Sequence, residues 1–258
     1  MIQLEFKNQK VKVDAGELVG YQVDGHEFIH QKGSPGWRSS DTEMFPVIGP
    51  TNNADFRVQT PKGKAVQDQH GLLREMEYHL VEQTGTKAVF RKKYTKDTPV
   101  TNSKYPDKST AEALFWPYDF EFSKMFELKE EGLEITFEIN AGMDMPFMLG
   151  YHPAFKLHAQ DAKVSVKERE ISIPQVMAVG HRAMQIPDHN VIVLKDKKDL
   201  KISTEGFGHF MLWTEVPNMV CIEPITFYPY TVAQENLHNG FEKLNDDNNT
   251  FQVVLTPQ

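Results

Sequence analysis

The chain has 258 residues, of which 40% are hydrophobic, and its 17 Phe, 8 Tyr and 3 Trp provide enough apolar surface for a large core. The formal net charge of −8 argues against a nucleic-acid partner, because neutralising phosphates requires a concentrated Lys and Arg surface. No run of about 18 apolar residues occurs, so we do not expect a membrane span.

The expected compartment and domain organisation follow from a few further features. A single cysteine, Cys221, excludes an internal disulfide and is typical of a reducing compartment. Residues 1–6 alternate in polarity and include Glu5, unlike a secretory signal peptide. The 15 Pro and 16 Gly are spread along the chain rather than gathered in a linker. We therefore expect a cytoplasmic protein with one domain, residues 1–258, and the sequence leaves its oligomeric state open.

The first half of the chain contains two hairpin signals. Asp24-Gly25 lies between two short strand-like runs, and both residues tolerate the positive φ that a type I′ turn requires. Residues 75–83 and 87–95 are strand-like and flank a Thr-Gly-Thr turn. Residues 95–109 follow as a polar loop interrupted by proline, long enough to form a lid or rim.

After this loop the sequence predicts a short helix at residues 109–115 and then mainly strands. Residues 120–128 and 133–139 alternate with period two, which indicates an antiparallel hairpin with one buried face. Lys124 is the lone polar residue on that face. Alternation recurs at residues 251–255. Together these patterns predict an all-β fold, an antiparallel β-sandwich in which two extended sheets pack face to face.

Three titratable residues, His152, Glu223 and His70, each precede a proline or a glycine, which restricts or frees the backbone at that point. His152 precedes Pro153, which confines it to extended geometry and ends the strand, so the imidazole is held at a strand edge. Histidine exchanges protons near neutrality, which makes a general acid one interpretation and a structural histidine the other. Glu223 follows the apolar run 219–222, where a carboxylate must be paired or shifted in pKa, so it is either a base or half of a structural ion pair.

His70 precedes Gly71, which permits positive φ or a close backbone approach, and Arg74 adds a cation four residues later. Both could bind sugar hydroxyls, or they could be an ordinary loop histidine and a solvated arginine. Trp213 is either a core aromatic or a platform for the apolar face of a sugar. No metal site is expected, because the histidine spacing and the single cysteine do not fit a zinc site. Cys221 lies among apolar residues and is not expected to act as a nucleophile.

Four ordered segments resemble the aldose 1-epimerase (galactose mutarotase) family, especially its bacterial branch of LacX-like proteins. They are Trp37 with Phe45-Pro46-Val47-Ile48-Gly49, His70-Gly71-Leu72-Leu73-Arg74, Gly150-Tyr151-His152-Pro153-Ala154-Phe155, and Leu212-Trp213 with Cys221-Ile222-Glu223-Pro224. The resemblance implies a galactose-mutarotase-like β-supersandwich and no organic cofactor. It also implies His152 as general acid, Glu223 as general base and His70 as a catalytic and sugar-binding residue. We further expect Arg74 and Trp213 to bind the sugar.

Two departures from the family pattern concern the substrate pocket. Gly49 is followed by Pro50 where relatives carry an arginine, and Ile225-Thr226-Phe227 replaces a Trp-Gly pair. The expected reaction is interconversion of the α and β anomers of a free aldose, a small sugar being the expected partner. A hexose-6-phosphate mutarotase and a non-catalytic carbohydrate-binding or sugar-sensing protein on the same fold are the alternatives.

Overall fold

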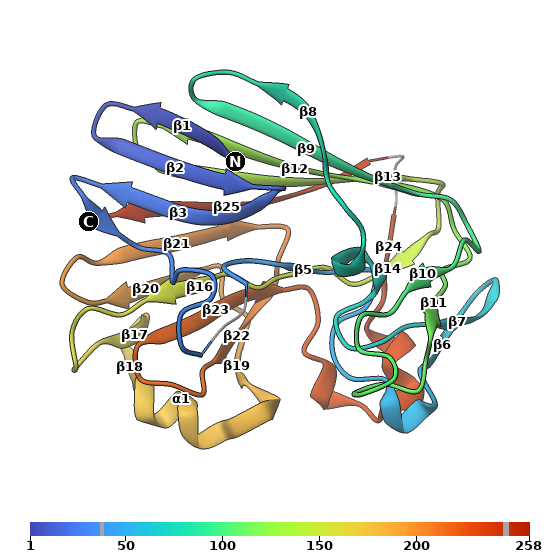
Figure 1. The fold of residues 1–258 in the computed structure, drawn as a ribbon. Coiled ribbons are helices and arrows are strands. Elements are labelled where there is room, and N and C mark those ends of the chain that lie inside the picture. Colours follow the sequence, from blue (N-terminus) through green and yellow to red (C-terminus); the bar gives the residue numbers. More distant parts are fainter. Residues whose placement is uncertain (37–38, 245–247) are drawn as a thin grey trace.

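The computed structural model describes residues 1–36, 39–244 and 248–258, without the side chain of Asn248. Its largest element is a nine-stranded antiparallel sheet. Figure 1 shows this sheet from β8 at the top to β18 at the lower left. The strand order is β18 (Arg169–Ser172), β17 (Lys163–Val166), β20 (Val191–Lys195), β21 (Leu200–Glu205), β25 (Asn248–Pro257), β13 (Gly132–Ala141), β12 (Phe120–Lys129), β9 (Lys87–Tyr94) and β8 (His79–Gln83).

A second, six-stranded sheet has much shorter strands. Its order is β19 (Met184–Pro187), β22 (His209–Trp213), β23 (Met219–Ile225), β15 (Gly150–Tyr151) and β5 (Glu43–Met44), with β16 (Ala154–Lys156) paired to β23. The two sheets pack through aromatic side chains: the rings of Phe45 and Phe122 lie 5.2 Å apart, and those of Tyr151 and Phe137 lie 5.1 Å apart. The apolar alternation of β12 and β13 therefore buries one face of the nine-stranded sheet against the second sheet.

Smaller elements complete the fold. A four-stranded sheet contains β1 (Ile2–Phe6), β2 (Gln9–Asp14), β3 (Glu17–Val23) and β4 (His26–Glu27). Three strand pairs are β6 (Arg57–Thr60) with β7 (Gly63–Val66), β10 (Val100–Thr101) with β11 (Ala113–Leu114), and β14 (Pro146–Phe147) with β24 (Glu242–Lys243). The helices are α1 (Ile173–Val179), at the bottom of Figure 1, and the short 3-10 helices η1 (Asn52–Ala54), η2 (Leu72–Glu75), η3 (Gly180–Arg182), η4 (Pro229–Thr231) and η5 (Gln234–Gly240). Within the described ranges, no helix is long and apolar enough to cross a membrane.

Most of the strand predictions are confirmed. β12 and β13 pair from Phe120 with Ala141 to Lys129 with Gly132, and their inward side chains, including Lys124, are buried. The Asp24-Gly25 turn joins β3 to β4 with positive φ at both residues. Residues 251–255 lie in β25, between β21 and β13. The all-β, antiparallel class is therefore correct.

Two elements predicted from the sequence differ from those in the structure. Residues 109–115 do not form a helix; Ala113–Leu114 is the strand β11, paired with β10. A helix this short gains too few hydrogen bonds to offset its nucleation, whereas the strand buries Leu114 in the core. The strand expected at residues 75–83 begins only at His79, because Glu75 closes the 3-10 helix η2.

Candidate active site

His152 follows the two-residue strand β15 and is fixed by its own backbone. Its N–H donates to the carbonyl oxygen of Thr42 at 2.8 Å, and its carbonyl oxygen accepts from the Thr42 N–H at 3.3 Å. Pro153 has no N–H to continue the ladder. The predicted strand end at His152 is therefore confirmed, and the ring projects from a rigid edge with its side chain 6% exposed.

Glu223 lies in β23, near the middle of the six-stranded sheet, where every residue of the strand is buried. Its Oε1 lies 3.3 Å from Nε2 of His152. The two residues are 71 positions apart in the sequence, and antiparallel pairing of β15 with β23 brings them together. The site thus contains a buried carboxyl group in contact with a buried imidazole.

His70 reaches the same place from a turn rather than a strand. His70 and Gly71 both have positive φ, 73° and 76°, and a Cβ at Gly71 would lie 2.2 Å from the carbonyl oxygen of Phe45. This close approach, which glycine permits, places the His70 ring 5.7 Å from the His152 ring in an edge-on arrangement. Nε2 of Gln69 lies 3.3 Å from Nε2 of His70.

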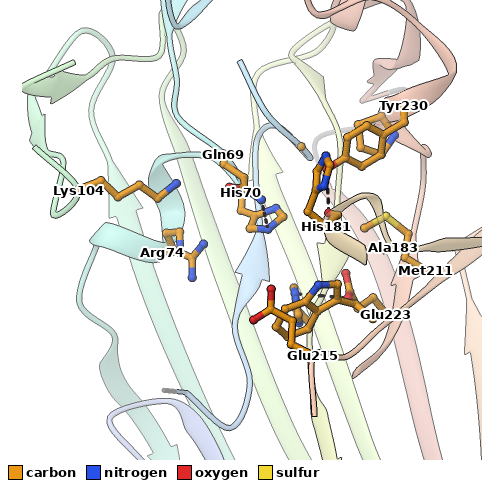
Figure 2. Close-up of a pocket in the computed structure, with 14 residues that line it drawn as sticks. Gln69, His70, Arg74, Lys104, His181, Ala183, Met211, Glu215, Glu223 and Tyr230 are labelled. Atoms are coloured by element: carbon orange, nitrogen blue, oxygen red, sulfur yellow. Dashed lines mark hydrogen bonds and ion pairs between the residues drawn. The ribbon is translucent and has the colours of Figure 1, made fainter. Parts of the chain in front are cut away.

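These side chains line one cavity of about 300 Å³, a volume suited to a small molecule. In Figure 2, Arg74 and Lys104 enter from one side of His70, while His181, Met211 and Tyr230 lie on the other. The Trp213 ring, also at the cavity, lies 6.2 Å from the His152 ring at 71°. All five residues singled out from the sequence therefore line the cavity, which is formed by Gly49, Gln69, His70, Arg74, Lys104, His152, His181, Ala183, Met211, Trp213, Glu215, Glu223, Pro229 and Tyr230.

Several lining residues were not identified from the sequence. His181 lies in η3 and Tyr230 in η4, and the Tyr230 hydroxyl donates to the carbonyl oxygen of His181 at 3.3 Å. Glu215 follows β22 and faces the cavity beside Trp213. None of these residues stands in a motif, and no short-range signal distinguishes them from surface residues. The loop predicted as a lid or rim does contribute Lys104.

Burial dominates the electrostatics of the site. It lowers the pKa of His152 to about 3, with a further lowering by the Arg74 charge. Burial, followed by the charges of Arg74, His152 and Lys104, lowers the pKa of His70 well below its usual value. Burial also raises the pKa of Glu223 well above its usual range. In the free protein, burial therefore favours the uncharged form of each of these three groups.

One trio in the described residues has the spacing of metal ligands. Ligand atoms of His152, Cys221 and Glu223 lie within 4.8 Å of one another, and all three residues are buried. The sequence did not predict this trio, because the ligands converge only through strand pairing. A metal would have to displace the Cys221 thiol proton, and burial raises the pKa of that thiol well above its usual value. The same burial makes Cys221 a poor nucleophile.

Comparison with known proteins identifies the family. The model of the aldose 1-epimerase family matches residues 16–189. The chain belongs to this family. The match includes His70, Arg74 and His152, and it ends before Trp213 and Glu223. A search among curated proteins found no match.

Solved structures share the fold over almost the whole chain. A galactose mutarotase-like protein from Lactobacillus casei has 15% identity and a TM-score of 0.77, covering 100% of both chains. A galactose mutarotase related enzyme from Lactobacillus acidophilus has 18% identity and a TM-score of 0.75, covering 98% of this chain and 96% of its own. A galactose mutarotase-like protein from Clostridium acetobutylicum has 13% identity and a TM-score of 0.71, covering 99% and 94%. At these identities the likeness shows the fold alone, which is the galactose-mutarotase-like sandwich predicted.

The two departures from the family pattern are Pro50, directly after Gly49, and residues 225–227. Gly49 lines the cavity with φ 89°, and a Cβ there would lie 2.4 Å from Cβ of Pro229. Thr226 instead exchanges hydrogen bonds with Leu149, three residues before His152. Within the described chain, residues 225–227 are not part of the cavity wall. Pro50, which stands where relatives carry an arginine, is likewise not among the described residues that line this cavity, although its neighbour Gly49 is. Trp37 of the family-like segment lies outside the described residues.

Proposed function

We propose that the protein is an aldose 1-epimerase that interconverts the α and β anomers of a free aldose. The observation that carries the proposal is the buried contact of 3.3 Å between His152 Nε2 and Glu223 Oε1 in the wall of a small cavity. In the proposal His152 is the general acid and Glu223 the general base. Membership of the aldose 1-epimerase family supports the reaction class.

The reaction needs a proton donor and an acceptor at the anomeric centre together. Glu223 removes the proton of the anomeric hydroxyl while His152 protonates the ring oxygen, and the bond between C1 and the ring oxygen breaks. The C1–C2 bond of the resulting aldehyde rotates. The C5 hydroxyl then attacks the other face of C1, His152 recovers its proton and Glu223 returns its own. General acid–base assistance of this kind contributes about 10²- to 10⁴-fold.

The protonation states of the free protein bear on these roles. The pair of His152 and Glu223 can be neutral, as an imidazole with a carboxylic acid, or charged, as an imidazolium with a carboxylate. Both states contain the same number of protons. Moving one proton across the 3.3 Å contact converts the first pair into the second. Burial favours the neutral pair when the cavity holds no sugar. Sugar hydroxyls that hydrogen-bond to both groups would favour the charged pair, because they replace the solvation lost on burial.

The remaining candidates would hold the sugar while C1 turns. His70 faces His152 across 5.7 Å and would bind hydroxyl groups near the reacting centre and assist the developing charge. Arg74 would donate hydrogen bonds from its planar guanidinium. Trp213 presents its ring beside His152, where it would cover an apolar face of the sugar.

Polarimetry tests the proposal directly. We expect the protein to accelerate the optical-rotation change of freshly dissolved α-galactose or another free aldose, with weak affinity for α-glucose, because Pro50 stands where relatives carry an arginine. His79→Asn, an exposed change on β8, is the matched control and should keep the full rate. Sugar binding without any acceleration would contradict the enzyme and favour the non-catalytic sugar-binding alternative.

A hexose-6-phosphate mutarotase is the second candidate, because Arg74 and Lys104 both line the cavity. Lys104, however, lies 2.9 Å from Asp68, and Glu215 adds a negative charge to the same wall. We therefore expect no marked preference for hexose 6-phosphates over free hexoses in kcat/KM. A preference of tenfold or more, roughly 1.4 kcal/mol, would favour the phosphorylated substrate.

A further inference from the structure

Lys124 is a charged residue in the middle of the buried face of β12, among Phe122 and Phe126. The residue is fully buried. Nζ donates to Oδ2 of Asp41 at 2.7 Å and to Oε1 of Glu43 at 2.6 Å. Asp41 and Glu43 belong to the segment that forms β5, at the edge of the six-stranded sheet. Lys124 therefore joins the two large sheets through a pair of buried ion pairs.

The carboxylates have further partners. Oδ2 of Asp41 accepts from the Tyr151 hydroxyl at 2.8 Å, and its Oδ1 accepts from the Leu18 N–H at 3.0 Å. Burial raises the pKa of Asp41 to about 6 although Lys124 opposes the shift. Burial would also raise the pKa of Glu43, but the nearby lysine charges lower it below its usual value. Desolvated ion pairs of this kind commonly add little to stability compared with apolar residues of equal size. Stability alone therefore does not account for the cluster.

The segment that Lys124 holds contacts both histidines of the site. Thr42, between Asp41 and Glu43, exchanges two backbone hydrogen bonds with His152, at 2.8 and 3.3 Å. Phe45, two residues after Glu43, donates its N–H to the carbonyl oxygen of His70 at 3.1 Å. Residues 41–45 thus fix the backbones of both histidines over a span of five residues.

We propose that Lys124 is a positioning residue, which holds residues 41–45 through Asp41 and Glu43 and thereby sets the places of the His70 and His152 rings. The kinetic part of this inference rests on the proposed function, and the geometric part does not. The rings lie 5.7 Å apart, and His152 must stay within reach of Glu223. A displacement of about 1 Å of a reacting group can reduce the rate about 100-fold.

The informative variant removes the three charges together. Lys124→Met alone leaves two carboxylates buried without their cation, which can unfold the protein. The triple variant Lys124→Met/Asp41→Asn/Glu43→Gln keeps similar side-chain sizes. The amide oxygen at position 41 can still accept from the Leu18 N–H, and the amide N–H can donate to the Tyr151 hydroxyl oxygen. Ile192→Ala is the matched control, because Ile192 is fully buried in β20, four strands from β12 in the nine-stranded sheet.

Two measurements test the proposal. We expect the triple variant to fold, by circular dichroism and thermal unfolding, and to lose about 10- to 100-fold in kcat with a smaller change in KM. In spectra of ¹⁵N-histidine-labelled protein, the His70 and His152 signals, assigned with His70→Asn and His152→Asn, should shift or broaden. Ile192→Ala should lower the melting temperature and leave kcat and both signals unchanged.

Two outcomes would overturn the proposal. In the first, the folded triple variant has wild-type kcat and unshifted histidine signals. In the second, Ile192→Ala loses as much kcat as the triple variant. If the triple variant does not fold, Asp41→Asn decides, since it removes one charge and keeps an amide oxygen that can accept from the Leu18 N–H. Shifted signals with a fall of about two- to tenfold in kcat support the proposal, and unshifted signals with full activity reject it. If the wild type does not accelerate mutarotation, the proposed function fails and the histidine spectra alone decide the positioning role.

Discussion

The two large sheets differ in regularity, and the difference separates stability from function. In the nine-stranded sheet, β12, β13 and β25 each have ten residues. In the six-stranded sheet, β5 and β15 have two residues each, and His152 directly follows β15. Long ladders bury a continuous apolar face, whereas short strands leave backbone groups and side chains to approach a cavity. His152 therefore lies where regular pairing is brief, whereas Glu223 lies in the longer strand β23 beside it. The nine-stranded sheet supplies a rigid background to both.

The largest expected effect comes from the acid–base pair in the short-stranded sheet. His152→Asn and Glu223→Gln should each reduce kcat by about 10²- to 10⁴-fold while retaining the far-UV spectrum and sugar affinity. The double variant should lose little beyond the worse single variant, because the two groups act as a unit. Polarimetry and isothermal titration measure both quantities. Near-wild-type turnover in either single variant would show that its assigned role is wrong.

The nine-stranded sheet should respond in the opposite way. Ile202→Ala removes a fully buried side chain from β21 and should lower the free energy of unfolding by about 2–5 kcal/mol. Since Ile202 is not part of the cavity, kcat below the melting temperature should not change. Val81→Ala, at an exposed position of β8, is the control and should alter stability by less than about 0.5 kcal/mol. A marked loss of kcat in Ile202→Ala would contradict the view that the nine-stranded sheet affects stability and not activity.

Two glycines offer a matched pair. At Gly71, which has φ 76°, an added Cβ would meet the Phe45 carbonyl, whereas at Gly85, in the turn between β8 and β9, nothing lies within 4 Å. Gly71→Ala should lower stability by about 1–3 kcal/mol and displace His70, with a clear fall in kcat/KM. Gly85→Ala should change neither quantity measurably. Chemical denaturation and polarimetry provide the comparison, and equal behaviour of the two variants would contradict it.

Buried histidines should also make stability depend on pH. In the folded protein the pKa of His152 is lowered from 6.5 to about 3. The neutral histidine therefore makes its full contribution to the free energy of unfolding above pH 6.5, and this contribution is lost as the pH falls towards 3. At pH 5 the loss amounts to about 2 kcal/mol. Between pH 7 and pH 5, urea unfolding should show that His152→Asn loses less stability than the wild type, while other buried groups such as Glu223 contribute the same pH dependence to both proteins. Ile202→Ala should keep the wild-type pH effect, and an unchanged effect in His152→Asn would refute the assignment.

Short-range patterns in the sequence were sufficient for the regular part of the fold. Alternation along residues 120–128 and 133–139 predicts the central hairpin, because one buried face requires a period of two. Pro153 predicts the end of the strand at His152, and the apolar run before Glu223 predicts a buried carboxyl group. The five residues named from the family-like motifs all line one cavity, and their roles are predictions.

Only the tertiary structure decided which distant residues meet, since local sequence patterns do not indicate which residues of one sheet contact the other sheet. The sequence showed Lys124 as the odd polar residue of a strand, but its bonds to Asp41 and Glu43, more than 80 positions away, depend on how the sheets pack. His181, Glu215 and Tyr230 join the cavity for the same reason. The strand at Ala113–Leu114 forms because pairing and burial outweigh a weak local helix preference. Local chemistry thus determined the long strands and the reactive side chains, and long-range packing determined the short strand β11 and the geometry of the site.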